Sequence, residues 1–176
     1  MATLSAAGIG VRYVNNPSPN GFGFAIRRGL AEFCGEAVAI VMADGSDGSG
    51  RCHPFYRKLE SGYDCVFGSR FFRGGRVIDC PKFKLVLNRL ANLTIRTLFL
   101  MRYNDVTIAF KLYKRSAIAG IQLLLSHHFN STVELPLKCI VRGYRYTVLP
   151  NSWKGRKQGV SKLRIKKMGS FGENRL

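Results

Sequence analysis

Two aspartates stand directly after an apolar run, in an arrangement that could hold a metal ion. The run covers residues 37–43, and Asp44 and Asp47 follow it within a stretch rich in glycine and serine. Ligands of α/β proteins bind at the carboxyl ends of the strands. Carboxylates there can hold a hard divalent cation, which neutralises a diphosphate. The alternative is an Asx turn that only closes the strand.

Two arginines follow the next predicted strand and could bind phosphate. Arg70 and Arg73 lie in a short loop with glycines at both ends, residues 68–75 (GSRFFRGG). Guanidinium groups make paired hydrogen bonds to phosphate oxygens. A solvated basic loop would have the same composition, so the loop alone does not decide between the two interpretations.

The segment 156–162 (RKQGVSK) is a third candidate for phosphate binding. A glycine between cations, together with the hydroxyl of Ser161, can cradle a phosphate. The same segment could instead contact lipid headgroups. The histidines, His53, His127 and His128, form no set with serine and aspartate that would indicate nucleophilic catalysis.

Alternating strands and helices must position these groups. The run at 37–43 has the continuous apolar pattern of a strand that is buried on both faces of a parallel sheet. With the strand and the helix before it, this run predicts a βαβ unit, and the alternation that continues along the chain predicts an α/β protein. The predicted order is strand 8–16, helix 22–36, strand 37–43, helix 52–62, strand 63–71, helix 82–101, strand 105–115, helix 116–126, helix 131–143 and strand 144–153.

The long helix predicted at 82–101 is amphipathic. Leu87, Leu90 and Leu98 share one face, while Arg89 and other basic residues lie on another. We expect the apolar face to pack on the core, and a position on a membrane surface is the alternative.

The charge of the chain predicts an anionic partner. Its 28 Lys+Arg against 10 Asp+Glu give +18, and seven basic residues without an acidic one lie between Lys154 and Lys167. Nucleic acid, an anionic membrane or phosphorylated substrates would fit. The aromatic residues do not interleave with the basic tail as a base-stacking platform would require, so no specific nucleic-acid partner is expected, although nonspecific RNA binding stays open.

Cysteine usage and hydropathy indicate the compartment. The five cysteines are scattered and include no CxxC pair, which is typical of a reducing environment. No apolar run approaches the roughly 20 residues that cross a bilayer. We therefore expect a cytoplasmic protein that is soluble or peripheral to a membrane.

Seven segments, in order from about residue 10 to about residue 170, resemble family 2 glycosyltransferases of the polyprenyl-phosphate sugar synthase group, which includes dolichyl-phosphate mannose synthase. They are NGFGFAIRRGLAEFCGE, VMADGSD, YDCVFGSRFFRGG, NRLANLTIR, NDVTIAFKLYKR, TVELPLKCIVRGY and RKQGVSKL.

The resemblance implies a GT-A fold, an α/β sandwich around a mostly parallel sheet. It implies one partial catalytic domain over residues 1–176, with 154–176 as a basic tail. It further implies inverting transfer of a hexose from GDP-mannose or UDP-glucose to a polyprenyl phosphate, with Mg²⁺ or Mn²⁺. The reaction would take place at the cytoplasmic membrane face, with a membrane-anchoring partner as an option.

The resemblance also assigns roles to individual residues. Asp44 matches the second aspartate of the family's Asp-x-Asp metal motif, while Met42 replaces the first and Asp47 is expected to compensate. Ser46 is assigned as a polar residue that binds the nucleotide-sugar donor, and Arg70 lies beside the diphosphate of that donor. Arg156, Ser161 and Lys162 are assigned to close over phosphates. Asp105 takes part in catalysis with Asp44 and Arg70, and Glu134 matches the glutamate of the VELPLK segment.

The family opens with two strands and an Asn-Glu loop that bind the nucleoside, and these elements do not precede residue 8 here. We therefore expect an N-terminally truncated fold, or a second chain that supplies that half. The alternatives to an active transferase are an inactive fragment of the fold and a basic module that binds nucleic acid or anionic membranes.

Overall fold

The computed structural model describes residues 3–6, 9–47, 52–128 and 130–155. The residues proposed for phosphate closure, Arg156, Ser161 and Lys162, lie outside this range. The strands are β1 (Thr3–Ala6), β2 (Ile9–Arg12), β3 (Ala37–Ile40), β4 (Cys65–Ser69), β5 (Arg76–Ile78), β6 (Lys111–Lys114), β7 (Tyr146–Pro150) and β8 (Ser152–Lys154). The helices are α1 (Phe22–Glu32), α2 (Cys52–Glu60), α3 (Lys82–Leu98), α4 (Arg115–Gly120) and α5 (Ser131–Val141).

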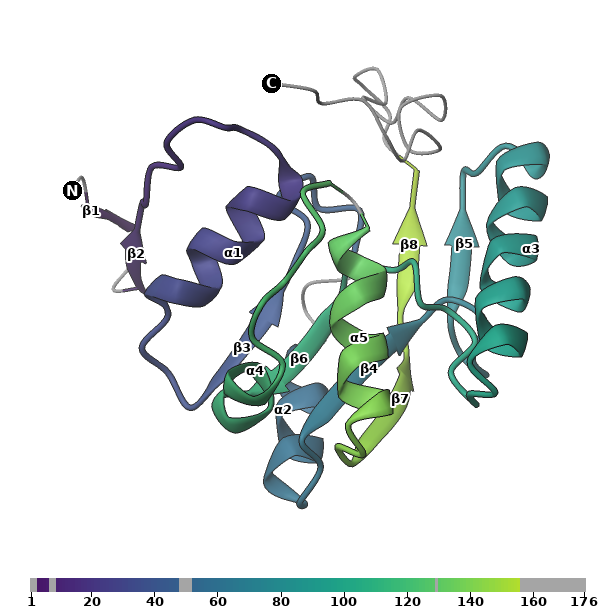
Figure 1. Ribbon diagram of the computed structural model, residues 1–176. Coiled ribbons are helices and arrows are strands. Elements are labelled where there is room, and N and C mark those ends of the chain that lie inside the picture. Colours follow the sequence, from purple (N-terminus) through teal and green to yellow (C-terminus); the bar gives the residue numbers. More distant parts are fainter. Residues whose placement is uncertain (1–2, 7–8, 48–51, 129, 156–176) are drawn as a thin grey trace, which may run out of the picture.

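A four-stranded sheet with the order β3-β6-β4-β7 forms the centre of the molecule (Figure 1). β4 and β7 are parallel, and β6 is antiparallel to both β3 and β4. Three of the four strands therefore run in the same direction, which confirms the predicted α/β class with a mostly parallel sheet. Because the carboxyl ends of β3 and β4 lie at the same edge, Asp44 and Arg70 are brought to one end of the sheet.

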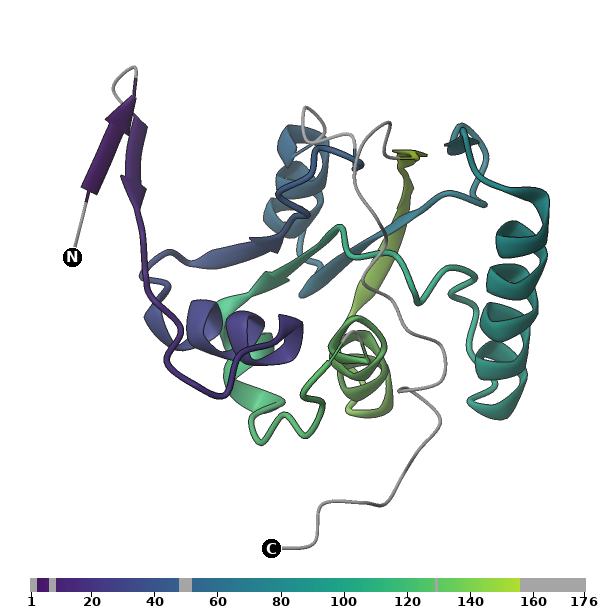
Figure 2. The same cartoon turned by 90° about the horizontal axis from the view of Figure 1, so that it is seen from above.

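Helices cover both faces of this sheet, as the view in Figure 2 shows. Side chains alternate along β4, so that Cys65 and Phe67 face α1 and α5 while Val66 faces α2. On the α2 side, Phe55 meets Phe110 edge to face with ring centroids 4.8 Å apart. The two cores hold the sheet rigidly between the helices.

A small second sheet extends the edge where the candidate groups lie. β5 and β8 are parallel, and Asp47 forms an isolated antiparallel bridge with Trp153 of β8. The backbone amide of Lys154 donates to the carbonyl of Ser46 at 2.9 Å. The acidic turn is thus held to the chain that leaves β7.

The predicted βαβ unit at the N-terminus is wrong. Within the described parts of the chain β2 pairs with β1 alone, in register from Thr3↔Arg12 to Ala6↔Ile9, and the pair stands apart from the central sheet (Figures 1 and 2). An antiparallel hairpin closes locally through a short connection, whereas a parallel pair needs a long crossover.

Two other predicted elements are shorter than expected. The strand predicted at 105–115 is a strand only from Lys111 to Lys114, and residues 105–110 form an irregular segment with a turn at 106–107. The helix predicted at 116–126 ends at Gly120. Farther along, Glu134 accepts hydrogen bonds from the backbone amides of Leu125 and Ser126, both at 2.7 Å, which holds that segment in a loop against α5.

Glu134 on α5 therefore has a structural role. Its carboxylate also pairs with Lys138 at 2.6 Å. Burial alone would raise the pKa of Glu134, but the hydrogen bonds from Lys138 and the two amides outweigh it and lower the pKa to about 2. The carboxylate is ionised at neutral pH and fastens the 123–126 loop.

The expected core packing of the long helix is also wrong. α3 lies at the end of the molecule farthest from the β1–β2 hairpin (Figure 2). Its only buried residue in the described structure is the polar Asn92, and its leucines at 87, 90, 93 and 98 are exposed.

Candidate active site

Arg70 and Asp105 form a buried ion pair at the end of β4. Nε of Arg70 donates to Oδ2 of Asp105 at 2.9 Å and Nη2 donates to Oδ1 at 2.6 Å, while the Arg70 backbone amide adds a bond to Oδ2 at 2.8 Å. The side chain of Arg70 is 11% exposed and that of Asp105 is 0% exposed. This is the two-pronged geometry in which guanidinium and carboxylate bind most strongly.

A layer of neutral polar groups surrounds the pair. Nη2 of Arg70 also donates to Oγ1 of Thr107 at 2.9 Å and to Oδ1 of Asn88 at 3.1 Å. Asn92, one turn after Asn88 on α3, donates to Asn88 and Thr107, both at 3.1 Å. α3 is therefore attached to the site by its polar face.

Asn88, Asn92 and Thr107 were not predicted as site residues from the sequence. The available signal was the i, i+4 spacing of Asn88 and Asn92 within an apolar helix. Paired amides at that spacing mark a face that meets a polar partner, and here the partner is the Arg70–Asp105 pair.

The ion pair keeps Arg70 charged despite its burial. Burial alone would lower the pKa of Arg70, but the hydrogen bond and the charge of Asp105 outweigh it and raise the pKa above its usual value. In this arrangement Asp105 and its neighbours orient the guanidinium. Arg73, the second arginine of the loop, is exposed and takes no part in the pair.

The glycines of the 68–75 loop are required by close backbone contacts. A Cβ on Gly75 would lie 2.5 Å from the carbonyl oxygen of Ser69 and 2.8 Å from that of Arg70. A Cβ on Gly68 would lie 2.9 Å from the carbonyl oxygen of Phe110. The loop folds back on itself, and this tight turn aims Arg70 at Asp105.

Lys111 is a buried cation that joins the site to α5. Its ammonium group donates to the carbonyls of Val106 and Thr132, both at 3.0 Å, and also to that of Ile108. Pro136 lies four residues after Thr132 inside α5 and has no N–H to donate to the Thr132 carbonyl. Lys111 supplies a donor for that carbonyl and fixes the turns that carry Asp105.

The environment of Lys111 opposes its charge. Burial lowers the pKa of Lys111 to about 7, and the charge of Arg70 acts in the same direction, while Asp105 and Asp47 oppose the change. The backbone carbonyls around the ammonium group provide the polar contacts that a buried cation requires.

The acidic turn contains the predicted Asx turn. Oδ1 of Asp44 accepts a hydrogen bond from the Ser46 backbone amide at 2.9 Å. Ser46 and Asp47 are both buried, at 7% and 2% exposure. The Asx turn does not exclude metal binding, because the carboxylate has a second oxygen and Asp47 follows three residues later.

Asp47 is the unusual member of this turn. Neither of its carboxylate oxygens has a hydrogen-bond partner of ordinary geometry among the described residues. Burial raises its pKa to about 6, and Asp44 adds to the rise, whereas Arg70, Lys111 and the Met42 backbone lower it. A buried carboxylate that accepts no hydrogen bond of ordinary geometry is costly unless a cation binds it.

The two aspartates fit a divalent cation, although the described part of the chain contains no group of three or more His, Cys, Asp or Glu side chains that could hold one. Mg²⁺ commonly binds to one or two protein carboxylates and completes its shell with water and substrate phosphates. The unpaired oxygens of Asp47 are the observation that supports this fit. The nearby end of β7 adds Asn151, whose buried side-chain amide also has no hydrogen-bond partner among the residues that the structure describes.

In a metal-free buffer with EDTA, Asp47→Asn is expected to raise the free energy of unfolding near pH 8 by up to about 3 kcal/mol. Between the ordinary pKa of 3.8 and about 6 the folded state binds more protons than the unfolded state, so stability falls as the pH rises through this window. Asparagine has no proton to lose, and the gain should therefore vanish below about pH 4. Urea denaturation across this range would check it, and a difference that is independent of pH would contradict it.

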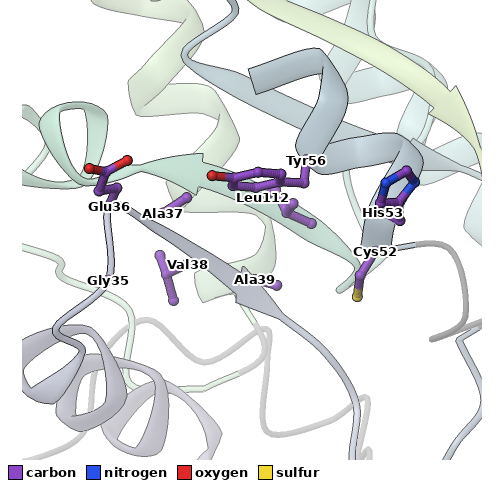
Figure 3. Close-up of a pocket in the computed structure, with 9 residues that line it drawn as sticks. All are labelled: Gly35, Glu36, Ala37, Val38, Ala39, Cys52, His53, Tyr56 and Leu112. Atoms are coloured by element: carbon purple, nitrogen blue, oxygen red, sulfur yellow. The ribbon is translucent and has the colours of Figure 1, made fainter. Parts of the chain in front are cut away.

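A hollow without the charged groups described above lies along the outer strand β3 (Figure 3). It has a volume of about 630 Å³ and lies between β3 and the start of α2, with Tyr56 and His53 on the α2 side. Among the described residues, its lining includes no arginine or lysine. It is therefore unsuited to binding a diphosphate, and the charged groups described above are the better candidates.

Comparisons with known proteins agree with this geometry. Residues 2–121 match the family described as glycosyl transferase family 2. The chain is 30% identical over 166 residues to a polyprenol monophosphomannose synthase of Mycolicibacterium smegmatis, covering 93% of this chain and 58% of that protein. It is 22% identical over 165 residues to an undecaprenyl-phosphate mannosyltransferase of Micrococcus luteus, covering 92% of this chain and 68% of that one.

Solved structures show the same fold. Glucosyl-3-phosphoglycerate synthase from Mycobacterium tuberculosis, in complex with phosphoglyceric acid, aligns with a TM-score of 0.58 at 15% identity, over 87% of this chain and 51% of that one. Its complex with Mn²⁺, UDP-glucose and glycerol 3-phosphate gives a TM-score of 0.55 at 15% identity. The predicted GT-A fold is thereby confirmed, and the chain spans about half the length of these structures.

Proposed function

Because this chain belongs to glycosyl transferase family 2, we propose that it transfers a hexose from a nucleotide sugar, GDP-mannose or UDP-glucose, to a polyprenyl phosphate. The names of the two relatives, a polyprenol monophosphomannose synthase and an undecaprenyl-phosphate mannosyltransferase, support the acceptor class. The observation that carries the proposal is the meeting of the acidic turn after β3 with Arg70 after β4, close enough for the charge of Arg70 to lower the pKa of Asp47.

The acceptor needs little activation. The second pKa of a phosphate monoester is near 6, so its attacking oxygen is largely ionised at neutral pH and no strong general base is required. Catalysis is then a matter of position and charge. Attack in line behind the anomeric carbon displaces the nucleoside diphosphate and inverts the configuration at that carbon.

Asp44 and Asp47 would hold Mg²⁺ or Mn²⁺, with Ser46 beside them. Such an ion would supply positive charge against the departing diphosphate. A solved structure of the same fold contains Mn²⁺ together with UDP-glucose, which supports this class of cofactor.

Arg70 supplies fixed positive charge at the end of β4, and Asp105 orients it. We assign Asp44 and Arg70 to direct contact with the ligands and Asp105 to positioning Arg70, since Asp105 is fully buried behind it. Arg156, Ser161 and Lys162 are proposed to close over the phosphates, as the sequence pattern indicates.

The acceptor class implies a membrane partner. No helix in the part of the chain that the structure describes is long and apolar enough to cross a bilayer. We propose that the protein acts at the cytoplasmic face of a membrane as a peripheral protein, attracted by anionic lipids through its charge of +18. A membrane-anchoring partner would strengthen this attachment.

The test is a transfer assay with Mn²⁺, each of the two nucleotide sugars and a short polyprenyl phosphate in detergent. The expected product is a polyprenyl-phosphate hexose with inverted anomeric configuration, and Asp44→Ala should reduce its formation by about 100-fold or more. Glu60→Ala, at an exposed end of α2, is the control and should be neutral.

The assay also separates the alternatives. A folded chain that gives no product with either donor would indicate an inactive fragment of the fold or a basic binding module. A product with retained configuration would contradict the in-line mechanism.

A further inference from the structure

Three consecutive side chains in the segment before β6 bind three consecutive residues at the end of β4. The two members of each pair are 35 positions apart, so the two segments lie in register, residue against residue. The pairs are Tyr103 with Gly68, Asn104 with Ser69, and Asp105 with Arg70. The segment 103–105 therefore fixes the stretch of chain from which Arg70 projects.

Asn104 is the central member of this segment, and it bonds to the chain on both sides of Arg70. Its Oδ1 accepts a hydrogen bond from the hydroxyl of Ser69 at 2.7 Å, and its Nδ2 donates to the backbone carbonyl of Phe71 at 3.2 Å. The hydroxyl of Ser69 in turn accepts a bond from the backbone amide of Phe71 at 3.1 Å. Three hydrogen bonds thus join the residues before and after Arg70 into one closed ring with Asn104.

The donors and acceptors of this ring are mutually consistent. The carbonyl of Phe71 can only accept, so it faces the NH₂ group of Asn104, and the amide oxygen faces Ser69. Because Oγ of Ser69 accepts from the Phe71 amide, its own proton is free to be donated to that oxygen. An ionised carboxylate or an alkyl side chain at position 104 could not make both bonds.

Phe71 also carries a ring that contacts two cations. The centroid of this ring lies 5.2 Å from Cζ of Arg70 and 4.3 Å from Cζ of Arg89 on α3. Both distances are within the range in which a guanidinium is attracted to an aromatic face. Because Asn104 holds the carbonyl of Phe71, it also helps to hold the ring against which the Arg70 guanidinium lies.

We propose that Asn104 is a positioning residue for Arg70. Asp105 fixes the charged end of Arg70 through the two-pronged ion pair, whereas Asn104 fixes the backbone on both sides of it. Both constraints bear on the reaction, because a displacement of about 1 Å in an active site can cost about 100-fold in rate. The expected effect on transfer rests on the proposed function, but the effect on the turn itself does not.

The first experiment measures the kinetics of hexose transfer by Asn104→Ala. We expect kcat to fall by about 10-fold, because Arg70 is then less well placed against the departing diphosphate. The KM for the nucleotide sugar should change by less than about 3-fold, because the charge that Arg70 opposes develops only as the diphosphate departs. An unchanged kcat would contradict the proposal.

Gln122→Ala is the matched control for this variant. The amide of Gln122 also donates one hydrogen bond to a backbone carbonyl, that of Ile118, at 3.2 Å. It lies just after α4, and its loss removes a bond of the same kind and length as the one from Asn104 to Phe71. This variant should transfer sugar as the original chain does.

A double-mutant cycle tests whether the bond between Ser69 and Asn104 carries the effect. Ser69→Ala removes that bond while Asn104 stays in place, and it should also lower kcat. The double variant Ser69→Ala/Asn104→Ala should be slower than Asn104→Ala alone by less than about 2-fold, since both changes disable one network. Losses that multiply would overturn the proposal. If Asn104→Ala does not fold, Ser69→Ala alone serves for the kinetic and exchange measurements.

A measurement without substrate reads the position of Arg70 directly. Its Nε–H donates to Asp105 at 2.9 Å, so this proton should exchange slowly with water in NMR spectra of ¹⁵N-labelled protein, and its signal should be absent from Arg70→Lys. Asn104→Ala should speed the exchange by about 10-fold relative to the backbone amides of β4 and β6. A purely structural role would speed all of these protons together, and an exchange rate without a selective change would overturn the proposal.

Failure of this inference can be told apart from failure of the proposed function. A chain that transfers no sugar but shows the selective change in Arg70 exchange contradicts only the proposed function. An active chain in which Asn104→Ala leaves both kcat and the Arg70 exchange as they were contradicts only the role of Asn104.

Discussion

Asp105→Asn is expected to lower the free energy of unfolding by about 3–5 kcal/mol. The substitution keeps the shape of the side chain but leaves the buried Arg70 guanidinium without its counter-charge. Asp105 accepts three hydrogen bonds from Arg70, at 2.6–2.9 Å, and is fully buried. Urea denaturation monitored by circular dichroism would measure the loss.

A surface ion pair provides the matched control. Arg57 and Glu60 lie 3.3 Å apart with side chains 68% and 46% exposed, so Glu60→Gln should cost less than about 1 kcal/mol. The double variant Arg70→Met/Asp105→Leu should lose less stability than Asp105→Asn alone, because it leaves no buried charge unpaired. A loss from Asp105→Asn as small as that from Glu60→Gln would contradict the role given to the buried pair.

Gly75→Ala is expected to lower the free energy of unfolding by about 3 kcal/mol and to displace Arg70. The added methyl group would meet the carbonyl oxygens of Ser69 at 2.5 Å and Arg70 at 2.8 Å. Both obstacles are backbone atoms, so relief requires the turn itself to open. The change can be measured by denaturation and by the loss of donor binding in the folded variant.

The control for this prediction is Gly29→Ala. Gly29 is an exposed residue inside α1, and an added Cβ would meet nothing within 4 Å. Alanine is favoured over glycine in a helix interior by up to about 1 kcal/mol, so this variant should be as stable as the original chain or more so. Equal destabilisation by the two substitutions would show that the turn after β4 is not sterically constrained.

The ends of the strands could be predicted from sequence because their signals are local. The apolar run before Asp44 and the strand predicted at 63–71 each lead into a loop with candidate site residues, and the structure places the ends of both strands, β3 and β4, at the same edge of the sheet. The pairing of Arg70 with Asp105 could not be predicted in this way. The two residues are 35 positions apart, and their pairing depends on β6 lying beside β4.

The long helix shows a different limit. Its periodicity correctly grouped Leu87, Leu90 and Leu98 on one face, but periodicity does not tell what covers that face. The side that packs on the protein carries Ile95 and two asparagines, Asn88 and Asn92, and the role of the asparagines is clear only once the buried ion pair is seen. The N-terminal prediction failed for a related reason. The strand itself was predicted correctly, but it pairs with β1 and does not join the sheet that contains β3.

Calorimetric titration with GDP-mannose and UDP-glucose tests the donor site most directly. With Mn²⁺ or Mg²⁺ present, we expect one of the two to bind, EDTA to abolish the binding, and Asp44→Ala to weaken it by about 10-fold or more. Glu60→Ala should bind as the original chain does. If neither nucleotide binds to the folded chain, or if binding survives both EDTA and Asp44→Ala, the acidic turn after β3 is not a donor site.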